Sequence, residues 1–387
     1  MLLEDHSYPA RLLALAAGAL LTAAWVFAAR RLAPGLPRLA AALPVLAFNC
    51  AAPLLFRRLD ATDRSKPNEM ISVGMIEFAF VWLCCYKVLA WVCNRGPLVR
   101  PWRPLQFAAI MLAPISPVEE HAAHAQQRNG RQAEHAGGAA VMAGAFAAKV
   151  ALLAAGLALV TFVPLPKLAR EFVYTLGIFS ILSFAMDGPA APISALLGVK
   201  VAPHFDAPFL ATSLSDFWSH RWDLVAGNQL RNCVYAPIVE GQLVHSAPPD
   251  RRRSARLSAA ASAAPAAAAQ RKQRRLLGMA ACFLVSGLMH EVQLWYMTGQ
   301  TSRGLLTAFF AAQVPLLLAE RWLGALLRRS GLLPPRPLRS VATLSVLLLL
   351  AHWTWWAAYE QYGVTQAAID SLQQLSRAVL GSSAGEP

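Results

Sequence analysis

Two groups of residues in this sequence could carry chemistry, and the first surrounds a histidine in an apolar segment. Within residues 283–297, helical spacing puts four side chains on one stripe: Ser286, His290, Gln293 and Met297. The side chains predicted to face lipid or partner helices are Leu284, Leu288 and Trp295. His290 lies about 21 Å along the helix from Leu276, at ~1.5 Å per residue. Loss of water there keeps an imidazole neutral at pH 7 and able to accept a proton. A core histidine bonded to a backbone carbonyl is the structural alternative.

The second group lies in residues 204–241, HFDAPFLATSLSDFWSHRWDLVAGNQLRNCVYAPIVEG. Ser213 followed by Asp216 resembles a capping box that opens a helix, and Pro237 limits where that helix ends. Helical spacing would put one set of side chains on one face: Asp216, His220, Asp223 and Gly227. The opposite face would hold Trp218, Trp222 and Val225. Arg221 and Arg231 suit a polyanionic ligand such as the phosphates of coenzyme A. An interfacial amphipathic helix without a ligand remains the alternative.

Further ionisable residues stand in apolar segments, where burial is costly and function is a default hypothesis: Glu77, Lys87, Lys149, Glu291 and His352. Structural pairing or snorkelling is favoured for Lys87 and Lys149. His352 lies in a Trp-rich segment that fits an aromatic belt as well as a ligand site. The EEHAAH tract at 119–124, with Glu134 and His135, lacks the HExxH order of zinc hydrolases, so a solvated loop without metal is predicted.

The composition of the chain indicates the class of fold that positions these residues. The chain has 387 residues, of which 56% are hydrophobic and only 14% charged, with a net charge of +14. That is too little polar surface for a water-soluble globule, and six cysteines without a CxxC pair exclude a disulfide scaffold. Apolar stretches of about 20 residues predict membrane spans near 10–29, 39–56, 70–93, 136–163, 171–186, 276–297, 304–319 and 340–358. The fifth and seventh are short, and Pro44 and Pro53 interrupt the second.

The predicted fold is therefore an all-α polytopic membrane bundle of about eight transmembrane helices, with amphipathic cytoplasmic helices. Placing both termini in the lumen puts most Lys and Arg residues in cytoplasmic loops. Residues 1–69 form an N-terminal hairpin, with a first span that is retained rather than cleaved, and 70–387 form the core. Residues 187–245 form a signature loop. Residues 246–275 form a low-complexity basic insertion that contacts anionic lipid headgroups; binding of nucleic acid is not expected.

Three separated motifs carry a resemblance to a known family. HFDAPFLATSLSDFW, followed by Arg221-Trp222 and LRNCVY, resembles the signature of plant-type wax synthases in the membrane-bound O-acyltransferase superfamily. Trp82-Leu83, Lys87 and Gly96-Pro97-Leu98 resemble that family's WL…K…GPL segment. FLVSGLMHE, at 283–291, resembles the segment that carries the superfamily's catalytic histidine. The motifs run in the family's order from about residue 82 to 297.

The resemblance implies an acyltransferase of the endoplasmic reticulum membrane. It would move a fatty acyl group from acyl-CoA, a co-substrate, to a long-chain alcohol and form a wax ester without a further cofactor. His290 would be the general base. Asp223 would be the second polar residue of the site, where wax synthases usually have Asn. The candidate substrate-binding residues are Asp216, Trp218, Arg221, Trp222, Arg231, Ser286 and Gln293.

Alternatives to a wax synthase remain open. Enzymes with this signature also use sterols, diacylglycerol or terpenoid alcohols as acceptors, and nothing in the sequence reads the acceptor. A different class, a transporter or lipid-binding protein, would place His290 on a permeation path. A transporter has no need of a cytoplasmic DFW…RW helix beside a mid-membrane histidine, whereas an acyltransferase does. A hydrolase is disfavoured because the sequence has no GxSxG motif.

Overall fold

The computed structural model describes residues 7–60, 63, 66–118, 139–245 and 265–381. Within these residues the chain is helical, apart from loops and one isolated β-bridge between Pro117 and Val201. Seven helices in the described ranges are long and apolar enough to cross a membrane. A shorter apolar helix, Phe146–Phe162, accompanies them. The predicted all-α polytopic membrane fold is confirmed.

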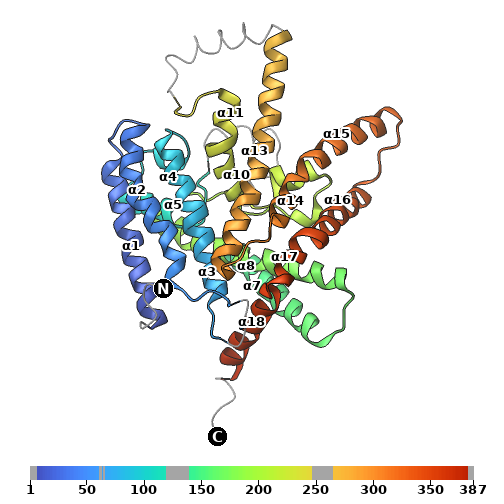
Figure 1. The fold of residues 1–387 in the computed structure, drawn as a ribbon, viewed down its shortest axis with the longest axis horizontal. Helices are drawn as coiled ribbons and strands as arrows, with labels where there is room; N and C mark the ends of the chain where they lie inside the picture. The colour runs from blue at the N-terminus through green and yellow to red at the C-terminus, as the bar shows by residue number, and fades with distance from the viewer. Residues whose placement is uncertain (1–6, 61–62, 64–65, 119–138, 246–264, 382–387) are drawn as a thin grey trace.

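The N-terminal helices form one side of the bundle (Figure 1). They are α1 (Tyr8–Ala29), α2 (Leu36–Ala51), η1 (Ala52–Leu55), α3 (Met70–Ile76), η2 (Glu77–Cys84), α4 (Cys85–Val92), η3 (Pro97–Val99) and α5 (Pro104–Leu112). Prolines in the first turn start α1, α2 and α5, where a missing backbone N–H costs nothing. Arg11 of α1 donates two hydrogen bonds to Glu69, at 2.6 and 2.8 Å, just before α3. This ion pair ties α1 to the residue that precedes α3.

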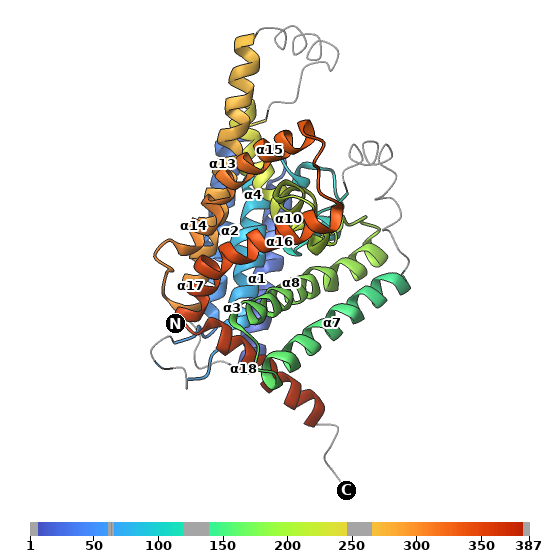
Figure 2. The same cartoon turned by 90° about the vertical axis from the view of Figure 1, so that its right-hand side faces the viewer.

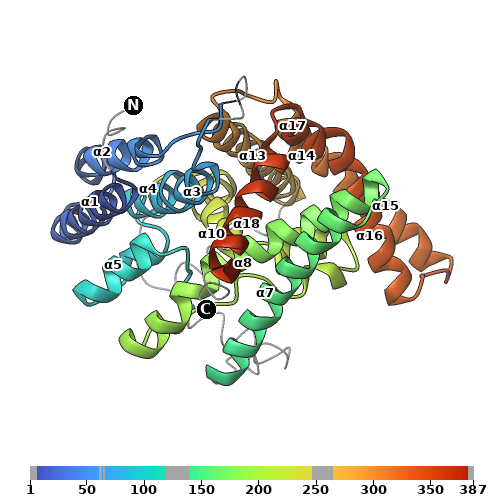
Figure 3. The same cartoon turned by 90° about the horizontal axis from the view of Figure 1, so that it is seen from below.

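The middle of the chain contributes a long hairpin and a broken segment. The hairpin is α7 (Ala139–Phe162) and α8 (Lys167–Leu197), which lie side by side in Figures 2 and 3. The segment that follows contains η5 (Pro208–Leu210), α9 (Leu214–Asp216), η6 (Phe217–Arg221), α10 (Leu224–Leu230), η7 (Arg231–Tyr235) and α11 (Ala236–Glu240). Gly198 and Gly241 end α8 and α11 in the left-handed conformation, at φ 66° and 71°, which glycine adopts without strain.

The C-terminal helices complete the bundle. They are α13 (Pro265–Thr298), α14 (Leu305–Ala311), α15 (Gln313–Arg329), α16 (Arg336–Ala351), η8 (His352–Trp356), α17 (Ala357–Gln361) and α18 (Val364–Gly381). In Figure 1 the start of α13 protrudes at the top, while α1 begins and α18 ends near the bottom. Residues 265–275 of the predicted basic insertion and the start of the first span therefore lie toward opposite ends of the bundle.

Several predicted boundaries are wrong. The spans predicted at 171–186 and 304–319 run over Lys167–Leu197 and Leu305–Arg329. They are longer because their charged residues have partners within the protein: Asp187 pairs with Lys149, and Glu320 accepts the backbone N–H of Leu214 at 2.6 Å. Residues 265–275, predicted as part of a loop, form the first turns of α13, because alanine has the highest helix propensity.

Lys87, which is buried, and Lys149, which is partly exposed, both have structural partners, as favoured from the sequence. Lys87 donates to the carbonyls of Ile110 and Ala113 at 2.7 and 2.6 Å, where a cation stabilises the C-terminal end of α5. Lys149 of α7 pairs with Asp187 of α8 and joins the two helices of the hairpin.

Candidate functional site

One large cavity runs through the bundle, with a volume of 1190 Å³. Its walls come from α3, η2, α7 and α8, from the segment η6–α10–η7, and from α13, α14 and α16–α18. Most of the wall is aliphatic or aromatic. It also carries basic side chains: Arg271, Lys272 and Arg275 belong to the first turns of α13, Arg231 to η7 and Arg321 to α15. The cavity therefore suits an amphipathic ligand with a long apolar part and an anionic group at one end.

His290 of α13 lines this cavity with one ring nitrogen already engaged. Its Nδ1 lies 2.7 Å from the carbonyl oxygen of Ser286, one turn earlier in the helix. Because a carbonyl can only accept, Nδ1 must carry the proton. In the neutral imidazole Nε2 then holds the lone pair, so that edge of the ring can act as a base. The bond to a backbone carbonyl, expected for a purely structural histidine, is therefore present, and the same residue also lines the cavity.

Aromatic rings hold the imidazole in place. Phe310 of α14 stacks on it, with ring centroids 4.5 Å apart and 25° between the planes. Trp82 of η2 and Trp355 of η8 contact it edge-on, at centroid distances of 5.0 and 4.9 Å. These rings come from three elements far apart in the sequence. They fix the ring orientation and surround it with apolar surface, which favours the neutral form.

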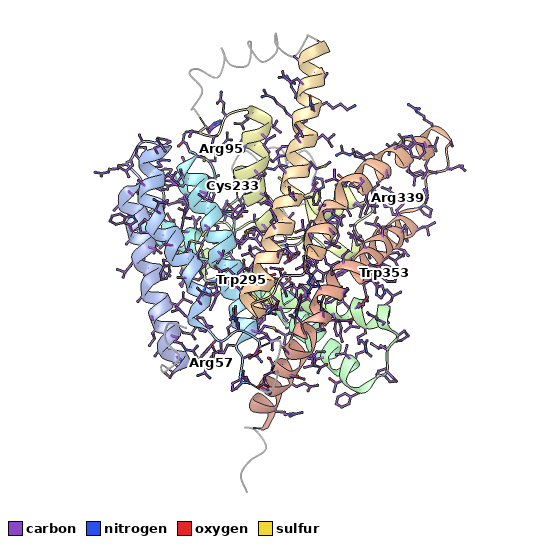
Figure 4. The ribbon with its side chains drawn as sticks, viewed as in Figure 1. Arg57, Arg95, Cys233, Trp295, Arg339 and Trp353 are labelled. Atoms are coloured by element: carbon purple, nitrogen blue, oxygen red, sulfur yellow. The ribbon has the colours of Figure 1, made fainter. Side chains whose placement is uncertain are left out.

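The other residues of the histidine stripe follow the predicted pattern. Ser286, Gln293 and Met297 also line the cavity, whereas Leu284, Leu288 and Trp295 are exposed on the outside of α13, as predicted. Figure 4 shows Trp295 on α13 and Trp353 on η8; Trp353 is 74% exposed. Glu291 accepts the backbone N–H of Ser302 at 2.8 Å. Glu291 therefore holds the turn that leads into α14, which carries Phe310.

The signature segment does not form the continuous helix predicted from its spacing. Ser213 caps α9 as expected, accepting the N–H of Asp216 at 2.9 Å. The helix then breaks, because Trp222 is extended and Asp223 is left-handed at φ 39°. Helical structure resumes and runs past Pro237 to Glu240, because that proline falls in the first turn of α11, where it is tolerated.

The break brings Trp218, Trp222 and Asp223 to the cavity together, although helical spacing assigned Asp223 to the opposite face. Trp218 donates its indole N–H to Gln313 at 3.0 Å. Trp222 stacks on Phe217 with centroids 5.3 Å apart and 17° between the planes. Both indoles are held rigidly in the cavity wall.

Asp223 occupies a strained position that its side chain helps to stabilise. Its carboxylate accepts the N–H of Ala226 at 3.0 Å and caps α10. Asp and Asn are the non-glycine residues that best tolerate the left-handed region, and both cap helices. Burial raises the pKa of Asp223 to about 6, while the Ala226 N–H and the nearby His204 act in the opposite direction. The carboxyl therefore loses its proton only near neutral pH.

Two of the nine predicted site residues lie away from this cavity. Arg221 donates to Asp216 at 2.8 Å and to the carbonyl of Asp206 at 3.0 Å. Asp216 also accepts the N–H of Thr212 at 3.1 Å. This ion pair braces the loop before α9 and lines a separate groove beside Arg336 and Arg339. Substrate contact by Asp216 and Arg221 stays a prediction, whereas the other seven residues share the large cavity.

Sequence reasoning missed part of the site. The ring contacts of Phe310 and Trp355 with His290 had no sequence signal, because they depend on how α14 and η8 pack. Trp82 had a signal, since it belongs to the WL motif. His352 lies outside the cavity lining and pairs with the buried Glu171 at 2.8 Å. The EEHAAH tract lies outside the described residues, among which no cluster of three His, Cys, Asp or Glu could hold a metal ion.

Comparison with known proteins tests the resemblance. Residues 201–312, which contain the broken segment and the histidine helix, match the model of the membrane bound O-acyl transferase family. The predicted resemblance to this family is confirmed. The chain is 23% identical over 344 residues to acyl-CoA–sterol O-acyltransferase 1 of Arabidopsis thaliana, covering 89% of this chain and 88% of that protein.

Relatives named for alcohol acceptors also match this acyltransferase-like chain. The long-chain-alcohol O-fatty-acyltransferase of Simmondsia chinensis is 27% identical over 278 residues, covering 71% of this chain and 68% of that protein. Probable long-chain-alcohol O-fatty-acyltransferase 1 of Arabidopsis thaliana is 29% identical over 206 residues, 53% of each chain. The relatives support an O-acyltransferase activity toward an alcohol or sterol, in an integral multi-pass membrane protein.

Proposed function

We propose that this protein is an acyl-CoA:long-chain-alcohol O-acyltransferase that forms wax esters, with His290 as its general base. The observation that carries the proposal is the imidazole on the cavity wall, with Nδ1 bonded to the Ser286 carbonyl and Nε2 left as the proton acceptor. A base held in one tautomer and orientation is typical of general base catalysis, which contributes about 10²–10⁴ in rate.

The reaction balances with this one base. Nε2 of His290 takes the hydroxyl proton as the alcohol oxygen attacks the thioester carbonyl carbon, and the carbonyl electrons move to its oxygen. When the tetrahedral intermediate collapses, the carbon–sulfur bond breaks and the sulfur leaves as thiolate. The imidazolium returns its proton to that thiolate, so ester and free coenzyme A are the products. No other proton donor and no cofactor besides the acyl-CoA co-substrate is required.

Asp223 acts in this proposal on the charge that forms at His290. With a pKa of about 6, its carboxyl is mostly ionised at pH 7. Asp223 and His290 line the same cavity, so the carboxylate stabilises the imidazolium that forms when Nε2 takes the hydroxyl proton. An ionised carboxylate cannot donate to the thioester carbonyl, so we do not assign Asp223 to stabilising the oxyanion. Asn, which is usual at this position in wax synthases, carries no charge and does not fill this role.

The remaining cavity residues fit a long acyl-CoA. The basic end, with Lys272 and Arg275 of α13 and Arg231 of η7, supplies cations for the phosphates of coenzyme A. Trp218, Trp222 and the aliphatic walls of α7 and α8 supply apolar surface for acyl and alkyl chains. We infer that the protein works in the endoplasmic reticulum membrane and that both the acyl donor and the acceptor are lipids.

A sterol acceptor is the second candidate, because the sterol acyltransferase relative aligns with 89% of this chain. The wax-ester proposal is favoured because several of the relatives are named as long-chain-alcohol O-fatty-acyltransferases. The transporter alternative is disfavoured, because the sterol and long-chain-alcohol relatives are all named as acyltransferases.

The test is lipid analysis of membranes from a host without neutral-lipid synthesis, supplied with palmitoyl-CoA and either hexadecanol, cholesterol or diacylglycerol. Wild type is compared with His290→Ala and with His352→Ala, a second membrane histidine that does not line the cavity. Wax ester from wild type and His352→Ala, but not from His290→Ala, is expected. Sterol ester in place of wax ester would keep the mechanism and change the substrate. Ester formation unaffected by His290→Ala would overturn the proposed base.

A further inference from the structure

Beside the cavity, three charged or titratable side chains form a chain of contacts across three segments. Asp187 of α8 lies 2.8 Å from Nδ1 of His204 through one carboxylate oxygen. Its other oxygen pairs with Nζ of Lys149, from the middle of α7. An unpaired lysine in an apolar helix costs free energy, and pairing with Asp187 lowers that cost for Lys149. The result is an anchored imidazole at the start of the signature segment.

The backbone joins His204 to the residue that follows Asp223. The carbonyl of His204 accepts the N–H of Leu224 at 2.9 Å, directly after Asp223. The bond joins two stretches that are 20 residues apart in the chain, on either side of η5, α9 and η6. His204 is therefore fixed to the point where Asp223 adopts its left-handed conformation at φ 39°.

The second ring nitrogen of His204, Nε2, has no hydrogen-bond partner among the described residues. The residue is only 3% exposed, so this atom is buried as well. A buried polar atom without a partner is destabilising, so it calls for an explanation. His204 lowers the pKa of the Asp223 carboxyl and so favours its ionised form. Asp187 and Lys149 contact His204 from α8 and α7.

We propose that His204, anchored by Asp187 and Lys149, is a positioning residue that holds the Asp223 carboxylate in place at the cavity. This inference rests on the role given to Asp223 in the proposed function. The anchored imidazole stabilises the carboxylate from one side, while the cap on Ala226 holds it from another. Asp187 and Lys149 also link Asp223 to the α7–α8 hairpin, which forms one wall of the cavity.

The test compares His204→Asn with wild type and combines it with Asp223→Asn. The Asn amide can still donate to Asp187 but lacks the imidazole ring. We expect His204→Asn to lower kcat about tenfold or more at pH 6, with the KM for acyl-CoA unchanged. Without His204 the pKa of Asp223 rises, so the acidic limb of the kcat profile moves up by about half a pH unit or more. In the Asp223→Asn background the same change is expected to cost less than about threefold.

The matched control is His352→Asn, which removes the other buried imidazole–carboxylate pair, with Glu171 at 2.8 Å. It is expected to reduce the amount of folded protein and to leave the pH profile of kcat unchanged. If His204→Asn behaves like this control, or costs the same in both Asp223 backgrounds, His204 is merely structural and the inference is wrong. If Asp223→Asn alone is fully active, both the Asp223 role and this inference fall, while the His290 test of the proposed function stands separately.

Discussion

The Nδ1–H of His290 donates to the carbonyl of Ser286, 2.7 Å away in the same helix, and this bond decides which nitrogen can act as a base. A helix carbonyl is an unusual partner, since it also receives the helical hydrogen bond of its own turn. It has two lone pairs, however, and can accept both donors. The imidazole is thereby held by its own helix, without help from an acidic side chain among the described residues.

Replacing His290 tests this arrangement most directly. His290→Asn keeps a side-chain N–H for the Ser286 carbonyl but cannot accept a proton, so kcat is expected to fall about 10²–10⁴-fold with little change in acyl-CoA binding. Single-turnover ester formation in detergent-solubilised protein measures this. Equal activity of His290→Asn and wild type would exclude proton transfer by this residue.

Stability and activity should move in opposite directions when Asp223 is replaced. Burial raises the pKa of Asp223 from 3.8 to about 6, so the folded state keeps a proton that the unfolded state has lost. The resulting stability is complete below about pH 4 and lost as the pH rises through 6, a difference of roughly 3 kcal/mol. Asp223→Asn does not titrate and still caps α10, so it should be more stable than wild type at pH 7.5.

Thermal unfolding in detergent at pH 4.5 and 7.5 checks this expectation. The advantage of Asp223→Asn over wild type should grow between the two pH values, while its activity falls. A constant difference in unfolding temperature would mean that the Asp223 carboxyl titrates as it does in the unfolded chain.

The basic end of the cavity should recognise the phosphates of coenzyme A. Removing two cations with Lys272→Gln and Arg275→Gln is expected to raise the KM for acyl-CoA about tenfold or more, because bonds to charged groups contribute about 1.5–3 kcal/mol each. The effect should shrink at high salt. Steady-state kinetics against acyl-CoA concentration measures it. The control Arg328→Gln with Arg329→Gln removes two exposed cations outside the cavity lining, and an equal effect there would contradict a specific site.

Close packing of α13 against α14 should be essential beside His290. A Cβ added at Gly287 would lie 2.7 Å from the Cα of Thr307, so the backbone of α14 must move. Gly287→Ala is expected to cost about 1–3 kcal/mol of stability and to displace the ring of Phe310 from the imidazole, lowering kcat. Gly144→Ala, in α7 with open space around its Cβ, is the control and should be neutral or slightly stabilising. Thermal unfolding and kcat of both variants decide the matter.

Much of this protein is determined by local sequence. Apolar length predicted the membrane helices, because about twenty mainly apolar residues match the thickness of the hydrocarbon core of a bilayer. Spacing of 3 and 4 put Ser286, His290 and Gln293 on one side of α13 and Trp295 on the other, because one helix of regular pitch determines its own faces. Ser213 capped α9 for the same local reason.

Tertiary structure decided the rest. The helix through the signature segment breaks at Trp222 and Asp223, since a left-handed residue capping α10 is stabilised by contacts that no periodicity reveals. Phe310, Trp355 and Trp82 meet at His290 only because α14, η8 and η2 pack around α13. The predicted fifth span ended at residue 186, yet α8 continues because Asp187 pairs with Lys149 and His204. Pairing with a residue far away in the sequence lowers the free-energy cost of burying a charged group. The hydropathy pattern of one segment does not show which residue will be that partner.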